Sequence, residues 1–286
     1  MRCLFTDHLK RMIMSAVIVL AGTAASGGAE TSPTIHLQSH RVVYDLGYVK
    51  SRPGSNVVDV QGRIVYELIG SSCEGYTINM RILTDLGLKD GNSSVTDTTM
   101  RNWEEYDGSR FVFETVSRNN DKLTENARGL AIRKPGGRRV VNLSKPKPKS
   151  GHQLPTNTVF PSEHLKLLIA SGRKGQARLD KKLFDGADDG LTPYDTTAYI
   201  GKTKPAEVKP GETPGNDRDK LKSLKSWPVA LSYYKKDVPG EGVPEYEVIF
   251  RLYENGFSDE LTFDYGDFVM SGKLKSYELI KETPCK

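Results

Sequence analysis

Histidines come first among the residues that could carry chemistry, because imidazole is a common metal ligand and general base. The 286-residue chain has five of them, and His36 and His40 stand on the same side of a segment, "IHLQSHRVVY", that has the pattern of a β-strand. Four residues of strand span about 13 Å, which is too far for two ligands of one metal ion. The sequence also lacks a glycine-rich phosphate loop. We therefore expect neither a metal site nor an organic cofactor.

Carboxylates gather in "MRNWEEYDG", which contains Glu104, Glu105 and Asp107. A glycosidase needs two carboxyl groups at a set separation across a sugar, and that is one interpretation of the cluster. It ends, however, in Asp107 and Gly108, a pair typical of a hairpin turn, so we favour solvated turn residues. The serines of "GSSC" do not stand in a Gly-x-Ser-x-Gly elbow. No catalytic residue is predicted, and we expect the protein not to be an enzyme.

Three further features each have a structural and a functional interpretation. His164 falls in the first turn of a predicted helix, where it either lies at the surface or lines a cavity, and we favour the surface. The basic runs 133–139 and 145–149 either solvate turns or contact anionic lipid headgroups or an acidic partner, and we favour turns. Trp103 and Trp227 are expected in the core or in a cavity wall.

The N-terminal residues indicate the compartment. A basic start with Arg2, Lys10 and Arg11 precedes an apolar or small run at 13–25, and small residues continue to Ala29. This three-part pattern is typical of a secretory signal peptide. The run is shorter than the roughly 20 apolar residues that span a membrane. We expect export followed by cleavage, with residues 1–29 as the signal peptide.

Export would leave two cysteines, Cys73 and Cys285, because Cys3 would be removed with the signal peptide. In an oxidising compartment two cysteines allow one intramolecular bridge. The alternative is two free, buried thiols. A bridge closing so long a loop would stabilise the fold by roughly 5 kcal/mol at most. We expect this bridge, which would tie the C-terminus back to an early strand.

Charge and size exclude some functions. The full chain has 41 basic and 36 acidic residues, a net charge of +5. Cleavage after Ala29 would remove three basic residues and one acidic residue and would lower that charge by two. So balanced a chain does not favour nucleic acid as a partner. The remaining residues, 30–286, are enough for a substantial core, and we expect a single domain.

Strand patterns dominate the rest of the sequence. Apolar residues recur with a period of two in "RVVYDLGYV", "GRIVYELIG" and "YTINMRIL". Further strands rich in β-branched and aromatic residues are predicted in "RFVFETVS", "YEVIFRLYE" and "ELTFDYGDFVMSGKLKSYELI". Short strands separated by Gly, Asn and Asp predict an antiparallel, all-β protein. "ENG" at 254–256 predicts a hairpin. The Pro- and Lys-rich segment 144–157 is expected to be a connection, and the Pro-rich segment 202–223 a long exposed loop.

One α-helix is predicted in "FPSEHLKLLIASG". Ser162 is the expected N-cap and Gly172 the expected end. Leu165, Leu168 and Ile169 recur at helical spacing and form its apolar stripe. This is the main amphipathic helix that we expect.

The order of several motifs resembles a known family. "HRVVYDLGYVKSRPGSNVVDVQGRIVYEL", "SCEGYTINMR", "WEEYDGSRFVFE", "FPSEHLKLLI" and "KSWPVALSYY" are similar to segments of the EipB-type cell-envelope integrity proteins of Gram-negative bacteria, over residues 35–285. The resemblance implies a periplasmic protein whose long antiparallel sheet curls into a spiral or broken barrel around a cavity, with a Cys73–Cys285 disulfide. It also implies a functional link to a periplasmic tetratricopeptide-repeat protein and no catalytic residues.

A sheet that curls has an inner face made of alternate residues. Because an incompletely closed sheet cannot fill its interior from strands alone, we expect an apolar cavity bordered by the helix. The candidate lining residues are Tyr44, Leu46, Tyr66, Leu68, Tyr76, Ile78, Leu165, Leu168 and Ile169. The expected function is non-enzymatic maintenance of the cell envelope through a protein partner or a ligand held in this cavity. The alternative is a periplasmic carrier of lipid or lipoprotein, and a hydrolase of envelope polymers is disfavoured because no catalytic constellation is found.

Overall fold

The alternating segments form one long sheet in the computed structural model, which describes residues 35–205, 217–235, 242–282 and 285. The predicted signal peptide, 1–29, lies outside the described residues. The first eight strands are β1 (His40–Ser51), β2 (Val57–Ser71), β3 (Gly75–Leu88), β4 (Ser93–Glu104), β5 (Arg110–Asn119), β6 (Lys122–Arg133), β7 (Arg139–Lys145) and β8 (Lys149–Gln153). The other eight are β9 (Thr158–Val159), β10 (Arg178–Leu183), β11 (Tyr194–Ile200), β12 (Lys204–Pro205), β13 (Lys225–Tyr234), β14 (Tyr246–Tyr253), β15 (Ser258–Asp264) and β16 (Phe268–Leu279).

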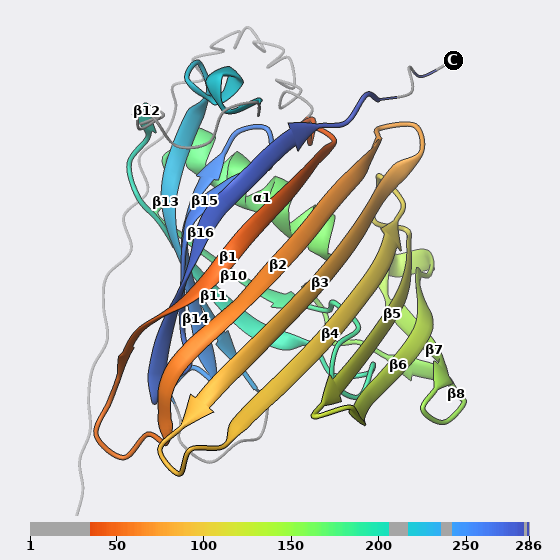
Figure 1. Cartoon of the computed structure of the whole chain (residues 1–286). Coiled ribbons are helices and arrows are strands. Elements are labelled where there is room, and N and C mark those ends of the chain that lie inside the picture. The colour runs from red at the N-terminus through yellow and green to blue at the C-terminus, as the bar shows by residue number, and fades with distance from the viewer. Residues whose placement is uncertain (1–34, 206–216, 236–241, 283–284, 286) are drawn as a thin grey trace, which may run out of the picture. The chain divides into compact units, whose positions relative to one another are not determined.

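Strand order follows the chain in two runs. From β8 to β1 each strand pairs with its neighbour in sequence, and β1 then pairs with β16, which begins the return through β15, β14, β13, β11 and β10 to β9 (Figure 1). The ladders between the described strands are antiparallel, as between β1 and β16, except for the short parallel contact of β9 with β10. The prediction of an antiparallel, all-β protein is confirmed.

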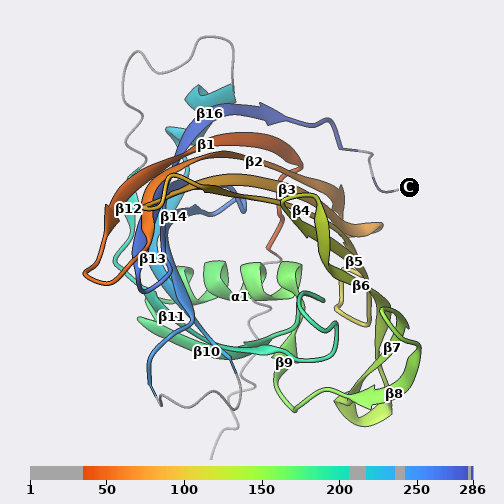
Figure 2. The same ribbon diagram turned by 60° about the horizontal axis from the view of Figure 1, so that its bottom comes forward.

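The sheet curls around α1 (Pro161–Arg173), the one α-helix among the described residues, as Figure 2 shows, with β1–β4 on one side of the helix and β10 and β11 on the other. The strand path ends at β8 and at β9 without a ladder between them. Residues from Ile35 to Lys286 form one compact unit. The predicted broken barrel with one main helix is therefore confirmed.

Cross-strand register places alternate residues on the concave side. On β1, Tyr44 stands opposite Ile64 of β2 and Leu274 of β16, and all three side chains belong to one buried cluster. Since successive residues of a strand point to opposite faces, the intervening residues point outward. Outward-facing Asp45 bonds Arg63 across the β1–β2 ladder at 2.6 Å.

Both expected ends of the helix are wrong. The helix begins at Pro161 with Phe160 as N-cap, because proline is preorganised for the first helical position and needs no N–H there. It continues past Gly172 to Arg173, and the left-handed residue that follows is Gly175 (φ +68°). Gly172 serves a different purpose, since a Cβ at this position would lie 2.7 Å from the Trp227 ring.

Of the predicted connections, the hairpin is confirmed, and two longer segments contain secondary structure that was not predicted. "ENG" joins β14 to β15, with Gly256 at φ +90°, so this hairpin is confirmed. The segment 144–157 is not only a connection, because β7 and β8 form a hairpin across Lys145–Lys149. In the segment 202–223, β12 pairs with β13 and a short 3₁₀ helix, η2 (Asp217–Leu221), follows; residues 206–216 lie outside the described residues.

The predicted disulfide is confirmed. Cys73 and Cys285 are bonded with their Cα atoms 5.8 Å apart. Cys73 lies in the turn between β2 and β3 rather than in a strand. The tail before Cys285 is also held by Glu282, whose carboxylate accepts the backbone N–H of Ser39 at 2.9 Å. No helix among the described residues is long and apolar enough to cross a membrane.

Candidate functional site: the concave face of the sheet

The concave face has two halves, which differ in what covers the strands. In the helix half, α1 packs against inward-facing side chains of the surrounding strands. Its fully buried members include Leu68, Tyr76, Leu168, Ile169 and Trp227. A third buried cluster, built around stacked phenylalanines, adjoins the start of the helix, and Phe111 and Phe160 lie 4.8 Å apart between ring centroids. Burial this complete leaves little room for a ligand in the helix half.

Glu104 links the sheet to the N-terminus of α1. Its two carboxylate oxygens accept the backbone N–H groups of Ser162 at 2.7 Å and Glu163 at 2.9 Å. Burial raises the pKa of Glu104 to about 7, while these N–H donors and the Lys166 ammonium act to lower it. The expectation of a solvated turn is wrong for Glu104, which ends β4 and is 2% exposed. Its contacts hold the N-terminus of the helix against the end of β4.

Two other polar residues at this end also differ from the sequence-based expectation. His164 is 4% exposed, so the favoured surface position is wrong, and burial lowers its pKa to about 4. Arg139, expected in a solvated basic turn, bonds Glu163 at 2.7 Å and lies over the Phe160 ring at 4.6 Å. His164 is part of α1 and Arg139 packs against its first turn, and the sequence alone shows neither the burial nor the contact.

The open half of the concave face lies along β3, β4, β14 and β15, beyond the reach of α1. Its inward-facing apolar side chains are Met80, Ile82, Leu86, Met100, Val248 and Phe263, and solvent reaches every one of them. They face inward because Met80 pairs in register with Met100, while Val248 pairs with Phe263 and with buried Leu231. Apolar side chains that point into a curled sheet and stay accessible provide a surface for an apolar molecule.

Tyrosines line the same half deeper inside. Burial raises the pKa values of Tyr66, Tyr233 and Tyr246, although solvent still reaches part of each side chain. Tyr233 and Tyr246 stack at 4.3 Å between centroids, and Tyr246 stacks in turn on Tyr265 at 5.8 Å. Stacking of the rings on one another stiffens the wall formed by β13 and β14.

A polar group closes one end of the open half. Asn102 on β4 is 5% exposed and Thr115 on β5 is 1% exposed, and both face inward. The side-chain amide of Asn102 approaches the backbone oxygen of Asp185 at 3.5 Å. Burial, together with the nearby charges of Asp188 and Asp185, raises the pKa of Glu125 on β6 to about 7.

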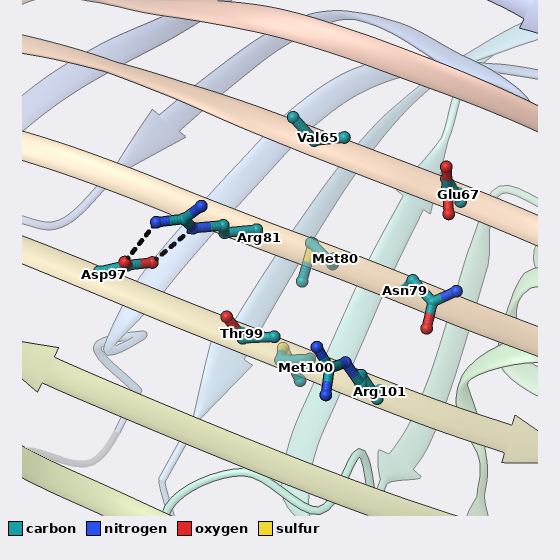
Figure 3. A pocket seen from close by; sticks show the side chains of 9 residues that line it. All are labelled: Val65, Glu67, Asn79, Met80, Arg81, Asp97, Thr99, Met100 and Arg101. Carbon is teal, nitrogen blue, oxygen red and sulfur yellow. Dashed lines mark hydrogen bonds and ion pairs between the residues drawn. The ribbon is translucent and has the colours of Figure 1, made fainter.

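The outer face of β2–β4 carries a shallow depression of about 340 Å³. Figure 3 shows that Arg81 and Asp97 cross it as an ion pair, at 2.7 Å. Outward-facing residues of three strands line it, and inward-facing Met80 and Met100 alternate with them. Solvated ion pairs of this kind are usual on an exposed sheet face, so the depression is not the candidate site.

The nine predicted lining residues all face inward, but most of them are packed. Tyr44, Leu46, Leu68, Tyr76, Leu168 and Ile169 are buried in the apolar clusters, and Tyr66, Ile78 and Leu165 are partly buried against them. Whether any of the nine contacts a ligand stays a prediction. Trp227 is in the core as expected, whereas Trp103 is on the outer face and donates its indole N–H to the Glu74 carbonyl at 3.0 Å.

Most of the accessible wall was missed from the sequence. Met80 and Ile82 lie in the alternating segment "YTINMRIL", but β14 and β15 were predicted only as strands. The available signal was polarity, since Thr96, Thr98 and Ser117 occupy inward-facing positions where a packed core would require apolar residues. The hydroxyl groups of Thr98 and Ser117 form a hydrogen bond with each other across the β4–β5 ladder, with their oxygens 2.8 Å apart.

Histidines near the N-terminus have separate surroundings. His36 forms an ion pair with Glu282 at 3.0 Å. Buried His40 packs among Tyr66, Phe257 and Tyr277, with ring centroids 5.6–5.9 Å away. Within the described ranges, no three His, Cys, Asp or Glu side chains are grouped so as to hold a metal ion.

Comparison with known proteins agrees with this architecture. The model of the EipB-like family matches residues 31–281. The cell envelope integrity protein EipB of Brucella abortus (strain 2308) is 34% identical over 265 residues, which are 93% of this chain and 91% of that protein. A crystal structure of a beta-barrel-like protein of the domain of unknown function DUF1849 from Brucella abortus has a TM-score of 0.78 and 33% identity, covering 87% of this chain and 100% of that one. The chain is a member of the EipB-like family.

Proposed function

We propose that this protein is a non-enzymatic factor of the periplasm that maintains cell-envelope integrity by holding an apolar ligand in the open half of the concave face. The envelope role is suggested by the name of the EipB relative. The observation that carries the ligand is the accessible, inward-facing apolar wall of Met80, Ile82, Met100 and Phe263. An interior surface left open to solvent costs free energy, and a bound apolar molecule would recover it.

Ligand binding is tested with the purified mature protein. N-phenyl-1-naphthylamine, an uncharged probe that fluoresces in apolar surroundings, should bind and be displaced by a saturated fatty alcohol. Ile82→Asp places a charge on the wall and should abolish binding. Leu83→Asp is the matched control, because Leu83 is the next residue of β3, faces outward and is 39% exposed. A wild-type protein that binds neither probe nor alcohol would contradict the proposal.

The natural ligand is sought by solvent extraction of protein purified from the periplasm. Mass spectrometry should find a stoichiometric amphiphile, and Ile82→Asp protein should lack it. The same preparation tests export, since its N-terminus should be Glu30 if residues 1–29 are removed as the sequence predicts. Protein retained in the cytoplasm with Met1 intact would contradict the periplasmic location.

The family resemblance supports a partner as well as a ligand. We propose that the protein acts with a periplasmic tetratricopeptide-repeat protein, and affinity purification from cross-linked cells should recover such a protein. A carrier of lipid or lipoprotein is the alternative function. It is distinguished by transfer, because a carrier moves its ligand from one vesicle population to another, whereas a resident factor keeps it.

A further inference from the structure

Three buried side-chain oxygens at the polar end of the open half have no hydrogen-bond partner. They are Asn102 Oδ1, Thr115 Oγ1 and Glu125 Oε1. An unsatisfied polar atom in a protein interior is destabilising, and each such group calls for an explanation. Three of them on the inward face of adjacent strands favour a shared explanation.

Register places these groups along a diagonal of the sheet, with Thr115 between Asn102 and Glu125, which are two strands and four residues apart. Thr115 pairs with Met100 of β4, and Asn102 is two residues further along β4 on the same inward face. Glu125 of β6 stands opposite Ser117, two residues from Thr115 along β5, so Glu125 and Thr115 are diagonal neighbours. The polar group therefore begins where the apolar wall ends, at Met100.

Acidic side chains surround this group from the facing loop. Asp185 follows β10 and lies deep enough that burial raises its pKa. Asp188 accepts the Tyr194 hydroxyl at 2.8 Å and pairs with Lys235 at 3.3 Å. Lys235 also pairs with Glu245 at 3.6 Å. One ammonium group thus faces several carboxyl groups, and the excess is negative.

The hydrogen-bonding capacity and the charge of the polar end indicate which ligand headgroup would fit there. The unpartnered oxygens can all accept hydrogen bonds, and the carboxylates can do nothing else when ionised. A phosphate or carboxylate headgroup would meet like charge and would leave these acceptors unsatisfied. Resting on the proposed function, we propose that the polar end of the open half binds the primary ammonium headgroup of an amphipathic ligand whose apolar part lies along the wall that starts at Met100.

An ammonium group supplies three N–H donors, and the Thr115 and Glu125 oxygens, on diagonal neighbours, are the pair that one such group can reach. Recognition therefore depends on hydrogen bonds and charge, and substitutions that preserve the side-chain shape can test it.

Three ligands with one chain length and different headgroups provide the test. Isothermal calorimetry at pH 8 should show dodecylamine binding at least about tenfold more tightly than dodecanol, a difference of about 1.4 kcal/mol. Dodecanoate should bind more weakly than dodecanol. Asp185→Asn and Glu125→Gln should each bring the affinity for dodecylamine to that for dodecanol, without changing the affinity for dodecanol itself.

Glu114→Gln is the matched control, since Glu114 precedes Thr115 on β5 and faces outward; it should keep the preference for the amine. Thr115→Val should reduce the preference while leaving the protein folded, because valine fills the same volume without the unsatisfied hydroxyl. If bridging water alone satisfies these oxygens, Thr115→Val will leave the preference unchanged, and that result would overturn the proposal.

The pH dependence of ligand affinity gives an independent test of the headgroup proposal. Glu125 faces Asp185, Asp188 and Lys235, and a bound cation favours its ionised form. Dodecylamine affinity should therefore rise between pH 6 and pH 8, while dodecanol affinity stays constant. Equal binding of all three ligands would overturn the headgroup proposal and leave the apolar site intact, whereas no heat with any of them would overturn both.

Discussion

The helix half and the open half of the concave face are built from the same alternating strands but reach different states. In the helix half, Leu68, Leu168 and Trp227 are 2% exposed or less. In the open half, Met80, Ile82 and Met100 keep contact with solvent although they face the same interior. Residue type does not explain this difference, because both sets are large and apolar. The helix does, since α1 is the layer that covers one set and not the other.

In the helix half, α1 therefore supplies the cover, whereas Tyr44, Ile64 and Leu274 are buried in a cluster of strand residues without it. A β-sheet buries its apolar face against another element or, where it curls, against itself, and α1, a helix of 13 residues, is about 20 Å long. It cannot cover strands as long as β2 and β3, which have 15 and 14 residues and extend over about 45–50 Å. The open half is the uncovered remainder.

The largest expected effect comes from a charge placed in each half. Leu168→Asp should cost about 4 kcal/mol or more in the free energy of unfolding, because a buried unpaired charge replaces a packed side chain. Ile82→Asp should cost about 1 kcal/mol or less, since water reaches the new carboxylate. Urea unfolding followed by circular dichroism measures both. Equal losses for the two variants would remove the distinction between the halves.

The disulfide fastens the C-terminal tail to the turn between β2 and β3, and its loss should rank second. Cys285→Ser should lower the free energy of unfolding by about 2–4 kcal/mol, because the bridge restricts the unfolded chain over a sequence separation of 212 residues. Ser72→Ala is the control for changes in the same turn, where the Ser72 hydroxyl lies 3.8 Å from the Cys285 sulfur. Reduction of the wild type should reproduce the variant, and an unchanged midpoint would contradict the prediction.

Acid should weaken the helix half through His164. The imidazole takes a proton near pH 6.5 in the unfolded chain but only near pH 4 in the folded protein, so folding stability falls as pH drops from about 6.5 towards 4. Between pH 7 and pH 5, His164→Gln should lose about 2 kcal/mol less stability than wild type. Glu104 opposes this trend, because burial raises its pKa to about 7 and the folded protein takes up its proton first.

Urea unfolding at both pH values measures the difference. His152→Gln, in the β7–β8 hairpin away from α1, controls for the loss of an imidazole. The prediction fails if the two histidine variants respond to acid alike. A steeper loss in Glu104→Gln would show that the carboxyl group offsets the histidine.

Contact between helix and sheet can be loosened by a single methyl group. Gly172→Ala would place a Cβ 2.7 Å from the Trp227 ring, so we expect a loss of about 1–3 kcal/mol from overpacking. Gly47→Ala is the matched control, because the nearest atom to a Cβ there is the Ser271 hydroxyl at 3.9 Å. Equal stability of the two variants would mean that the helix moves aside freely.

Local sequence predicted the strands, the hairpin at Gly256 and the disulfide, because alternation, turn chemistry and cysteine count are properties of short segments or of composition. It did not predict Glu104, whose burial depends on the N-terminus of α1 arriving from 58 residues away. His164 was placed at the surface for the same reason, since its covering residues come from other strands. The polar end was missed because Asn102, Thr115 and Glu125 resemble ordinary strand residues until the sheet brings them together.

The smallest effect on stability should accompany a clear effect on binding, and Met100 is the residue that tests this. Met100→Ala should change the free energy of unfolding by about 1 kcal/mol or less, because the side chain is already partly in water and its loss opens no closed cavity. Leu168→Ala, in the helix half, should cost about 2–5 kcal/mol for the opposite reason. For binding of N-phenyl-1-naphthylamine the order of the two variants reverses, and Met100→Ala has the larger effect. Removing about 40 Å² of contact at Met100 weakens binding by about 1 kcal/mol, or roughly fivefold, whereas Leu168→Ala leaves the wall of the open half unchanged. If Met100→Ala lowers stability as much as Leu168→Ala and leaves probe affinity unchanged, Met100 belongs to the core, and the open half cannot extend to the polar end.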